Sequence, residues 1–199
     1  MVDIARAEKK LRQAEFFLGW LEHTSREEMV KHLANPRSGN PEQLEYLFSA
    51  CLSAAQSVYY IIEKTGGANF KQMQKEWRRR IPDGDQFGRM IGLRGDDVHL
   101  GETGAEPLPK YVKEEPWNRS AFGTYYNSYN AALFGPEPVF EHVNPDGTKV
   151  VGSVMRGSLG LYLDWGGQRV DASTVCRKFI RLLRALLEAT KTAFGTVTA

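Results

Sequence analysis

The sequence predicts a mainly helical fold: a bundle of four to five helices with a small antiparallel β-meander before the last helix. Three observations lead to this prediction. Apolar residues recur every three or four positions in the first half of the chain and again near its end, which is the period of an amphipathic helix. Helix-starting and helix-ending residues flank these stretches. Between Pro138 and Gly167, the pattern changes to short runs of β-branched and aromatic residues separated by turn residues.

The first two helices are predicted at residues 3–23 and 41–64. The apolar stripe of the first consists of Ile4, Ala7, Leu11, Ala14, Leu18 and Leu21. Asn40 as the N-cap and Pro41 at the first helical position begin the second helix. Gly66-Gly67 is expected to end it, because glycine adopts the left-handed conformation that closes many helices. The second helix has two apolar rows, so we expect other elements to contact it on two sides.

Three further helices complete the predicted bundle. A short one carries Phe70, Met73 and Trp77 and stops before Pro82, which cannot continue a helix. The next spans residues 84–100. The last spans residues 172–194 and begins at Asp171 or Ser173, both of which are good N-cap residues.

Strands are predicted at residues 139–143, 149–155 and 159–165, with turns at Asn144–Gly147 and Gly166-Gly167. Residues 101–135 are rich in Pro, Gly, Asn and Tyr and are expected to form a surface connection; a short helix near 125–133 is an alternative there. A meander this small needs other elements to pack against. Residues 1–199 would then form one helical domain with a loop and β-meander insertion at about 101–170.

Composition narrows the class of protein. The formal net charge of +2 does not by itself indicate a polyanion-binding protein, so a nucleic-acid surface would be a local patch. Cys51 and Cys176 lie among apolar residues, which favours buried, reduced thiols. No stretch has the length and apolarity of a membrane span, and the N-terminus is unlike a signal peptide. We expect a cytoplasmic protein with no membrane association, no metal site and no cofactor.

The most informative chemical element is Arg-x4-His, from Arg94 to His99. Histidine gains and loses a proton near neutral pH, and arginine keeps its charge and presents a planar fork to phosphate oxygens. This pair suits metal-free phosphodiester chemistry. Asp96, on the same helical face as His99, is a candidate to hold the imidazole in one tautomer. The alternative is purely structural: a surface ion pair of Arg94 with Asp97, and a helix-terminal histidine favoured by the helix dipole.

A second candidate site is the run Trp77-Arg78-Arg79-Arg80. The indole is able to stack on a base while the guanidinium groups bind phosphates, which would make these four residues a nucleic-acid-binding cluster. The alternative is a core tryptophan followed by the charged end of a helix.

Three arginines, Arg177, Arg181 and Arg184, share one face of the predicted last helix. Such a stripe is typical of a solvated face. Glu188 is placed to pair with Arg184 one turn away.

Three stretches resemble the HEPN superfamily, helical domains that include many prokaryotic toxin ribonucleases. They are residues 5–18 in the first helix, 44–58 in the second, and Leu93-Arg94 to Val98-His99. The third is similar to the family's Arg-x4-6-His motif in order and place. The resemblance covers about residues 5–100 and the final helix, and it implies the helical bundle with the meander as an insertion.

The resemblance also implies a function. A HEPN-like protein with Arg94 and His99 would be a metal-independent endoribonuclease or a toxin-like RNA-cleaving protein. It would act as a homodimer and would have an antitoxin or nucleotidyltransferase partner. Active members usually carry a polar residue directly after the arginine, whereas this chain has Gly95, so Asp96 is the candidate replacement. The alternative is a non-catalytic HEPN-like module that binds nucleotide, RNA or a protein partner.

Overall fold

The computed structural model describes residues 2–34, 40, 42–97, 106–113, 140–152, 155–165 and 167–195. Its helices are α1 (Ile4–Ala34), α2 (Glu42–Arg80), α3 (Gly84–Asp97) and α5 (Ala172–Phe194). Its strands are β1 (Glu106–Lys113), β2 (Phe140–Val143), β3 (Lys149–Gly152), β4 (Met155–Asp164) and β5 (Arg169–Asp171). The prediction of a mainly helical chain with a small antiparallel strand region before the last helix is confirmed.

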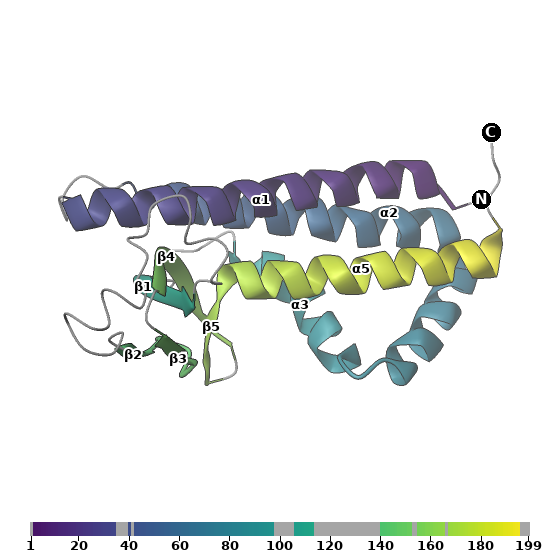
Figure 1. Cartoon of the computed structure of the whole chain (residues 1–199). Helices are drawn as coiled ribbons and strands as arrows, with labels where there is room; N and C mark the ends of the chain where they lie inside the picture. Colours follow the sequence, from purple (N-terminus) through teal and green to yellow (C-terminus); the bar gives the residue numbers. More distant parts are fainter. Residues whose placement is uncertain are drawn as a thin grey trace, which may run out of the picture.

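The helices α1, α2 and α5 run side by side, and the strands lie near the N-terminal end of α5 (Figure 1). Apolar side chains from the four described helices and from β4 form one buried core. Phe87 of α3 lies at its centre, where its ring contacts Tyr59, Trp77 and Phe179 edge to face. Full burial of each such side chain stabilises the fold by roughly 1.5–3 kcal/mol. Cys51 and Cys176 are buried in this core, as predicted.

The first helix is longer than predicted, because α1 continues past His23 to Ala34. Thr24 and Ser25 looked like a helix end in the sequence. In the fold, Thr24 is buried and the Ser25 hydroxyl donates a hydrogen bond to the Leu159 carbonyl of β4 at 2.6 Å. The strand β4 therefore contacts α1 beyond the predicted helix end, and tertiary packing overrides the local signal.

The second and third predicted helices form one element, α2, which breaks at Gly67. This glycine has a φ of 59°, in the left-handed region that other residues avoid. The predicted helix end at Gly66-Gly67 is therefore correct as a break in the helix, and the chain resumes a helical path directly afterwards. In the next helix, α3, the described part ends at Asp97, so the predicted residues 98–100 lie outside the described residues.

The last helix agrees with its prediction at both ends. Asp171 is the N-cap, and its carboxylate accepts a hydrogen bond from the backbone N–H of Thr174 at 3.2 Å. Gly195 follows the helix with a positive φ and donates its N–H to the Lys191 carbonyl at 2.9 Å. The expected pairing of Arg184 with Glu188 is wrong, because Arg184 pairs with Glu15 on α1.

That contact belongs to a ladder of ion pairs between the antiparallel helices α1 and α5. Its three rungs are Glu8–Lys191, Glu15–Arg184 and Glu22–Arg177. Successive rungs are seven residues apart on each helix, which is two turns, so the same two faces meet along most of the interface. What looked like a solvated arginine stripe is therefore partly an interhelical contact.

The predicted three-stranded meander is wrong in its pairing. The hairpin of β2 and β3 forms around the predicted turn and is a separate two-stranded sheet. The strand β4 instead pairs with β5 and with β1, in the order β1-β4-β5. Residues 106–113, which the sequence placed in a surface connection, are thus the edge strand β1. The proposed short helix at 125–133 lies outside the described residues.

The strand β1 was not predicted because it contains Pro107 and Pro109. Proline has no backbone N–H and therefore cannot donate a hydrogen bond to a neighbouring strand. In an antiparallel edge strand, alternate residues direct their backbone groups away from the neighbouring strand. Tyr111 is such a residue, since its N–H donates to Asn144 Oδ1 and its carbonyl accepts from Asn144 Nδ2, each at 2.8 Å. The two prolines share this alternation with Tyr111, so they remove no hydrogen bond to β4.

Candidate functional site

The predicted catalytic residues are placed by α3. Arg94 and Asp96 belong to its last turn, and His99 follows it outside the described residues. The structure thus describes the backbone of Arg94 and Asp96, while the side chains of both residues and the whole of His99 lie outside what it describes. The sequence prediction of their roles stays a prediction.

A buried amide holds α3 one turn before Arg94. Gln56, in the middle of α2, donates from Nε2 to the carbonyls of Met90 at 3.4 Å and Ile91 at 3.1 Å. Its side chain is fully buried, and its Oε1 has no hydrogen-bond partner among the described residues. Because a buried amide is costly unless it is bonded, this contact specifies how α3 sits on α2. The sequence did not single out Gln56, since one glutamine in an apolar helix carries no distinctive pattern.

The second predicted site, Trp77 to Arg80, is divided between two roles. Trp77 is half-buried, and its ring meets Phe87 at a centroid distance of 5.2 Å. Arg78 donates from Nε to the Gly84 carbonyl at 3.2 Å and thereby bridges the turn between α2 and α3. Arg79 and Arg80 are exposed, and Arg80 lies 3.9 Å from Glu76. Arg79 and Arg80 are thus the two members of the cluster on the surface, with Arg80 near the carboxylate of Glu76, and the nucleic-acid role stays a prediction.

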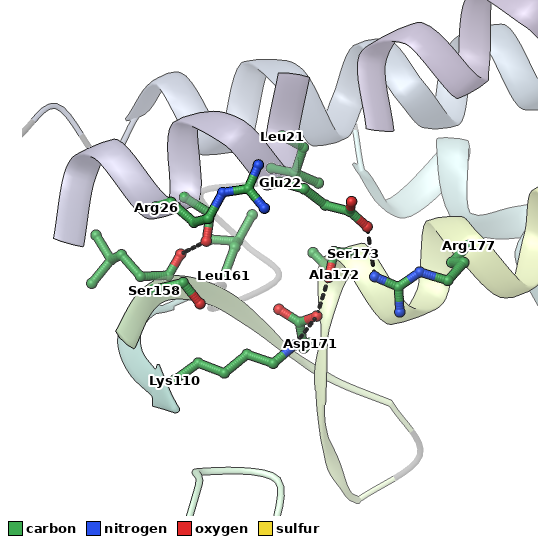
Figure 2. Close-up of a pocket in the computed structure, with 12 residues that line it drawn as sticks. Leu21, Glu22, Arg26, Lys110, Ser158, Leu161, Asp171, Ala172, Ser173 and Arg177 are labelled. Carbon is green, nitrogen blue, oxygen red and sulfur yellow. Dashed lines mark hydrogen bonds and ion pairs between the residues drawn. The ribbon is translucent and has the colours of Figure 1, made fainter. Parts of the chain in front are cut away.

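A pocket that the sequence did not predict lies where α1, β1, β4 and the start of α5 meet (Figure 2). Its volume is about 220 Å³. Arg26 of α1, Lys110 of β1 and Arg177 of α5 approach it from three elements (Figure 2). These residues are far apart in the sequence, and Lys110 lies in a stretch expected to be a loop, so no local signal joins them.

The pocket has more positive than negative groups. Lys110 Nζ lies 3.0 Å from Asp171 Oδ2, and Arg177 pairs with Glu22, so two cations are neutralised (Figure 2). Arg26 has no ion-pair partner within the described part of the chain. An uncompensated guanidinium at the rim of a polar pocket is a ready contact for a phosphate or carboxylate.

Hydroxyl groups complete the pocket lining. The Ser173 hydroxyl donates a hydrogen bond to the Asp171 carboxylate. The same carboxylate accepts a hydrogen bond from the backbone N–H of Thr174, and this second bond orients it. Ser158 lies in β4 opposite Lys110 of β1. The arrangement is suited to binding a small anion.

Two further kinds of feature concern the described ranges, a metal centre and a membrane-spanning helix. No group of three His, Cys, Asp or Glu side chains there is arranged to hold a metal ion. No described helix combines the length and apolarity that a membrane crossing requires.

Comparisons with known proteins do not assign the chain to a family: no family model, no curated protein and no solved structure matches it.

Proposed function

We propose that this chain is a HEPN-like helical domain that cleaves RNA without a metal ion, with Arg94 and His99 as the catalytic pair. Asp96 would orient His99. The observation that supports the proposal best is the clamp between Gln56 and the backbone of α3 one turn before Arg94. A catalytic arginine must be held in a fixed direction, and a helix anchored in the core by a buried hydrogen bond is a rigid base for it.

The chemistry follows from the two side chains. A neutral His99 accepts the proton of a ribose 2′-hydroxyl as the 2′-oxygen forms a bond to phosphorus. The bond from phosphorus to the 5′-oxygen breaks, and a charged imidazole, that of a second copy's His99, protonates the leaving oxygen. Arg94 stabilises the negative charge on the phosphoryl oxygens. The products are a 2′,3′-cyclic phosphate and a 5′-hydroxyl. Because the reaction uses two imidazoles, we propose that the protein acts as a homodimer. We place this homodimer in the cytoplasm.

Cleavage of mixed RNA in the presence of a chelator tests this proposal. His99→Ala is expected to lower the rate by at least about 100-fold, because general acid–base catalysis contributes about that much or more. Arg94→Lys is expected to fail similarly, since an ammonium lacks the planar fork. The matched controls are His142→Ala in β2 and Arg89→Lys on the exposed side of α3, which are expected to keep full activity. Intact RNA with the parent protein contradicts the catalytic proposal.

The second candidate is a non-catalytic HEPN-like module that binds nucleotide, RNA or a protein partner. Gly95, where active relatives carry a polar residue, favours it, and so does the unpaired Arg26 at the pocket. For this candidate, RNA or nucleotide would bind without being cut. Arg26→Ala is expected to weaken binding about tenfold, with Arg6→Ala, also on the surface of α1, as the control.

Gly95→Asn separates the two candidates. If an inert parent gains cleavage with this substitution, the chain is a disabled member of the family. If an active parent is unchanged, Asp96 is the supporting group. In cells, the toxin-like form of the proposal expects growth arrest on expression, relieved by His99→Ala and by an antitoxin or nucleotidyltransferase partner.

A further inference from the structure

One face of α1 is exposed from Lys9 to Glu27. Its members are Lys9, Gln13, Phe16, Trp20, His23 and Glu27, and we call them the outer face of α1. Their spacing alternates between four and three residues, which is the spacing of a helix seam that packs on another helix. Each of the first five lies two positions after a residue of the predicted inner stripe at Ala7 to Leu21, so the outer face points away from the core.

The centre of the outer face is aromatic. Phe16 is 59% exposed and Trp20 is 47% exposed, and both are among the large apolar side chains that the described fold leaves uncovered. Their rings lie 6.2 Å apart, and Trp20 meets His23 at 5.6 Å, so the three rings form one continuous strip. Aromatic side chains are enriched at the centres of protein interfaces and are costly to leave in water.

The outer face is also complementary to itself. When two copies of α1 are laid antiparallel about a two-fold axis near Leu18, Phe16 of each copy meets Trp20 of the other. In the same register Gln13 meets His23, and Lys9 meets Glu27. Aromatic residues thus occupy the two central layers, polar residues the next, and opposite charges the ends. A parallel arrangement would instead put like charges together at both ends.

We infer that the outer face of α1 is a homodimer interface, in which a second copy of this chain packs its α1 antiparallel. The six residues span about 27 Å of helix, enough for several layers of side chains. Lys9 has no ion-pair partner among the described residues, and Glu27 contacts only the exposed His23 of its own helix, at 3.2 Å. Both charges are therefore available to a second copy. The inference is argued from α1 alone. The proposed RNA cleavage also requires a homodimer, so a monomeric parent would count against both, whereas the register of the cross-links described below tests the α1 interface by itself.

Sedimentation of the full chain at graded concentrations tests the interface. The parent is expected to form a dimer, and Trp20→Glu is expected to weaken it by at least about 30-fold, because a central aromatic anchor contributes about 2 kcal/mol or more. Lys9→Glu and Glu27→Lys each place like charges at the ends and should weaken the dimer at low salt. Combining the two substitutions should restore it. Lys75→Glu, on the exposed surface of α2, is the control and should change nothing.

A cysteine experiment tests the register directly. Gln13→Cys and His23→Cys are prepared as separate proteins, oxidised alone, and oxidised after mixing. Only the mixture is expected to give a cross-linked dimer, since antiparallel packing brings position 13 of one copy to position 23 of the other. Cross-linking of Gln13→Cys alone would indicate a different register and overturn the inference. So would a parent chain that stays monomeric up to about 0.5 mM.

Discussion

The helical frame and the strand region are held together in different ways. In the frame formed by α1, α2 and α5, many apolar side chains share one core, and the ion pairs between α1 and α5 lie on its surface. The strand region reaches the same core through Leu159, Leu161 and Leu163 of β4. Single polar contacts add to this packing, such as Asn144 with the backbone of Tyr111 and Lys110 with Asp171. The strand region also contains a buried hydroxyl, that of Tyr162, with no partner among the described residues. Loss of one contact should therefore change the free energy of unfolding by different amounts in the two regions.

The largest effect is expected in the core of the frame. Leu52 is buried on α2, and Leu52→Ala should lower the free energy of unfolding by roughly 2–5 kcal/mol through lost burial and a residual cavity. Leu182→Ala on α5 should act similarly. The control is Gln72→Ala on the exposed side of α2. Denaturation midpoints that do not move for either leucine would show that shared packing does not stabilise the frame.

An intermediate effect is expected from Asn144→Ala in the strand region. The substitution leaves the N–H and carbonyl of Tyr111 without their partner, at a cost of about 1–3 kcal/mol. Hydrogen exchange at the Tyr111 amide should accelerate with it. Val143→Thr, at the neighbouring exposed position, should be neutral. If the Tyr111 amide exchanges at the same rate in both variants, the contact is not what holds the hairpin to β1.

Tyr162→Phe should change the free energy of unfolding in the opposite direction from Asn144→Ala, although both residues belong to the strand region. Removing a buried, unpartnered hydroxyl is expected to be neutral or to stabilise the fold by up to about 1 kcal/mol. Burial raises the pKa of Tyr162 above its ordinary 10.0, with help from the carboxylates of Asp146 and Asp171. The folded chain therefore resists this ionisation, and stability present below about pH 10 is lost as the pH rises further. Unfolding measured between pH 9 and about pH 11 should show a shallower alkaline decline for Tyr162→Phe than for the parent; equal declines would contradict the assignment.

The smallest effect is expected from the ion-pair ladder. Glu15 and Arg184 are partly exposed, so their pairing should contribute only about 0.2–1 kcal/mol, and less at high salt. A double-mutant cycle with Glu15→Gln and Arg184→Gln isolates that coupling. A coupling energy well above this range would place the ladder among the main stabilising contacts of the frame.

The accuracy of the sequence predictions follows the same division. The bounds of α5 and the break at Gly67 were predicted because helix hydrogen bonds join residues four apart, so that local residues specify them. The length of α1 was underestimated because β4 contacts the helix at Ser25, just where the local sequence signals a helix end. The strand β1 was missed because its prolines are acceptable only at a sheet edge, and the edge exists only after β4 pairs with it.

The sequence by itself determined the helical class, the bounds of α5, the buried state of the two cysteines and the presence of the Arg94–His99 motif. Each of these depends on neighbours in the chain or on the period of the helix. Only the tertiary structure decided that Arg184 pairs with Glu15, that Gln56 clamps α3, and that Arg26, Lys110 and Arg177 share one pocket. Those contacts join residues tens of positions apart, and their energies depend on distances that no local pattern encodes.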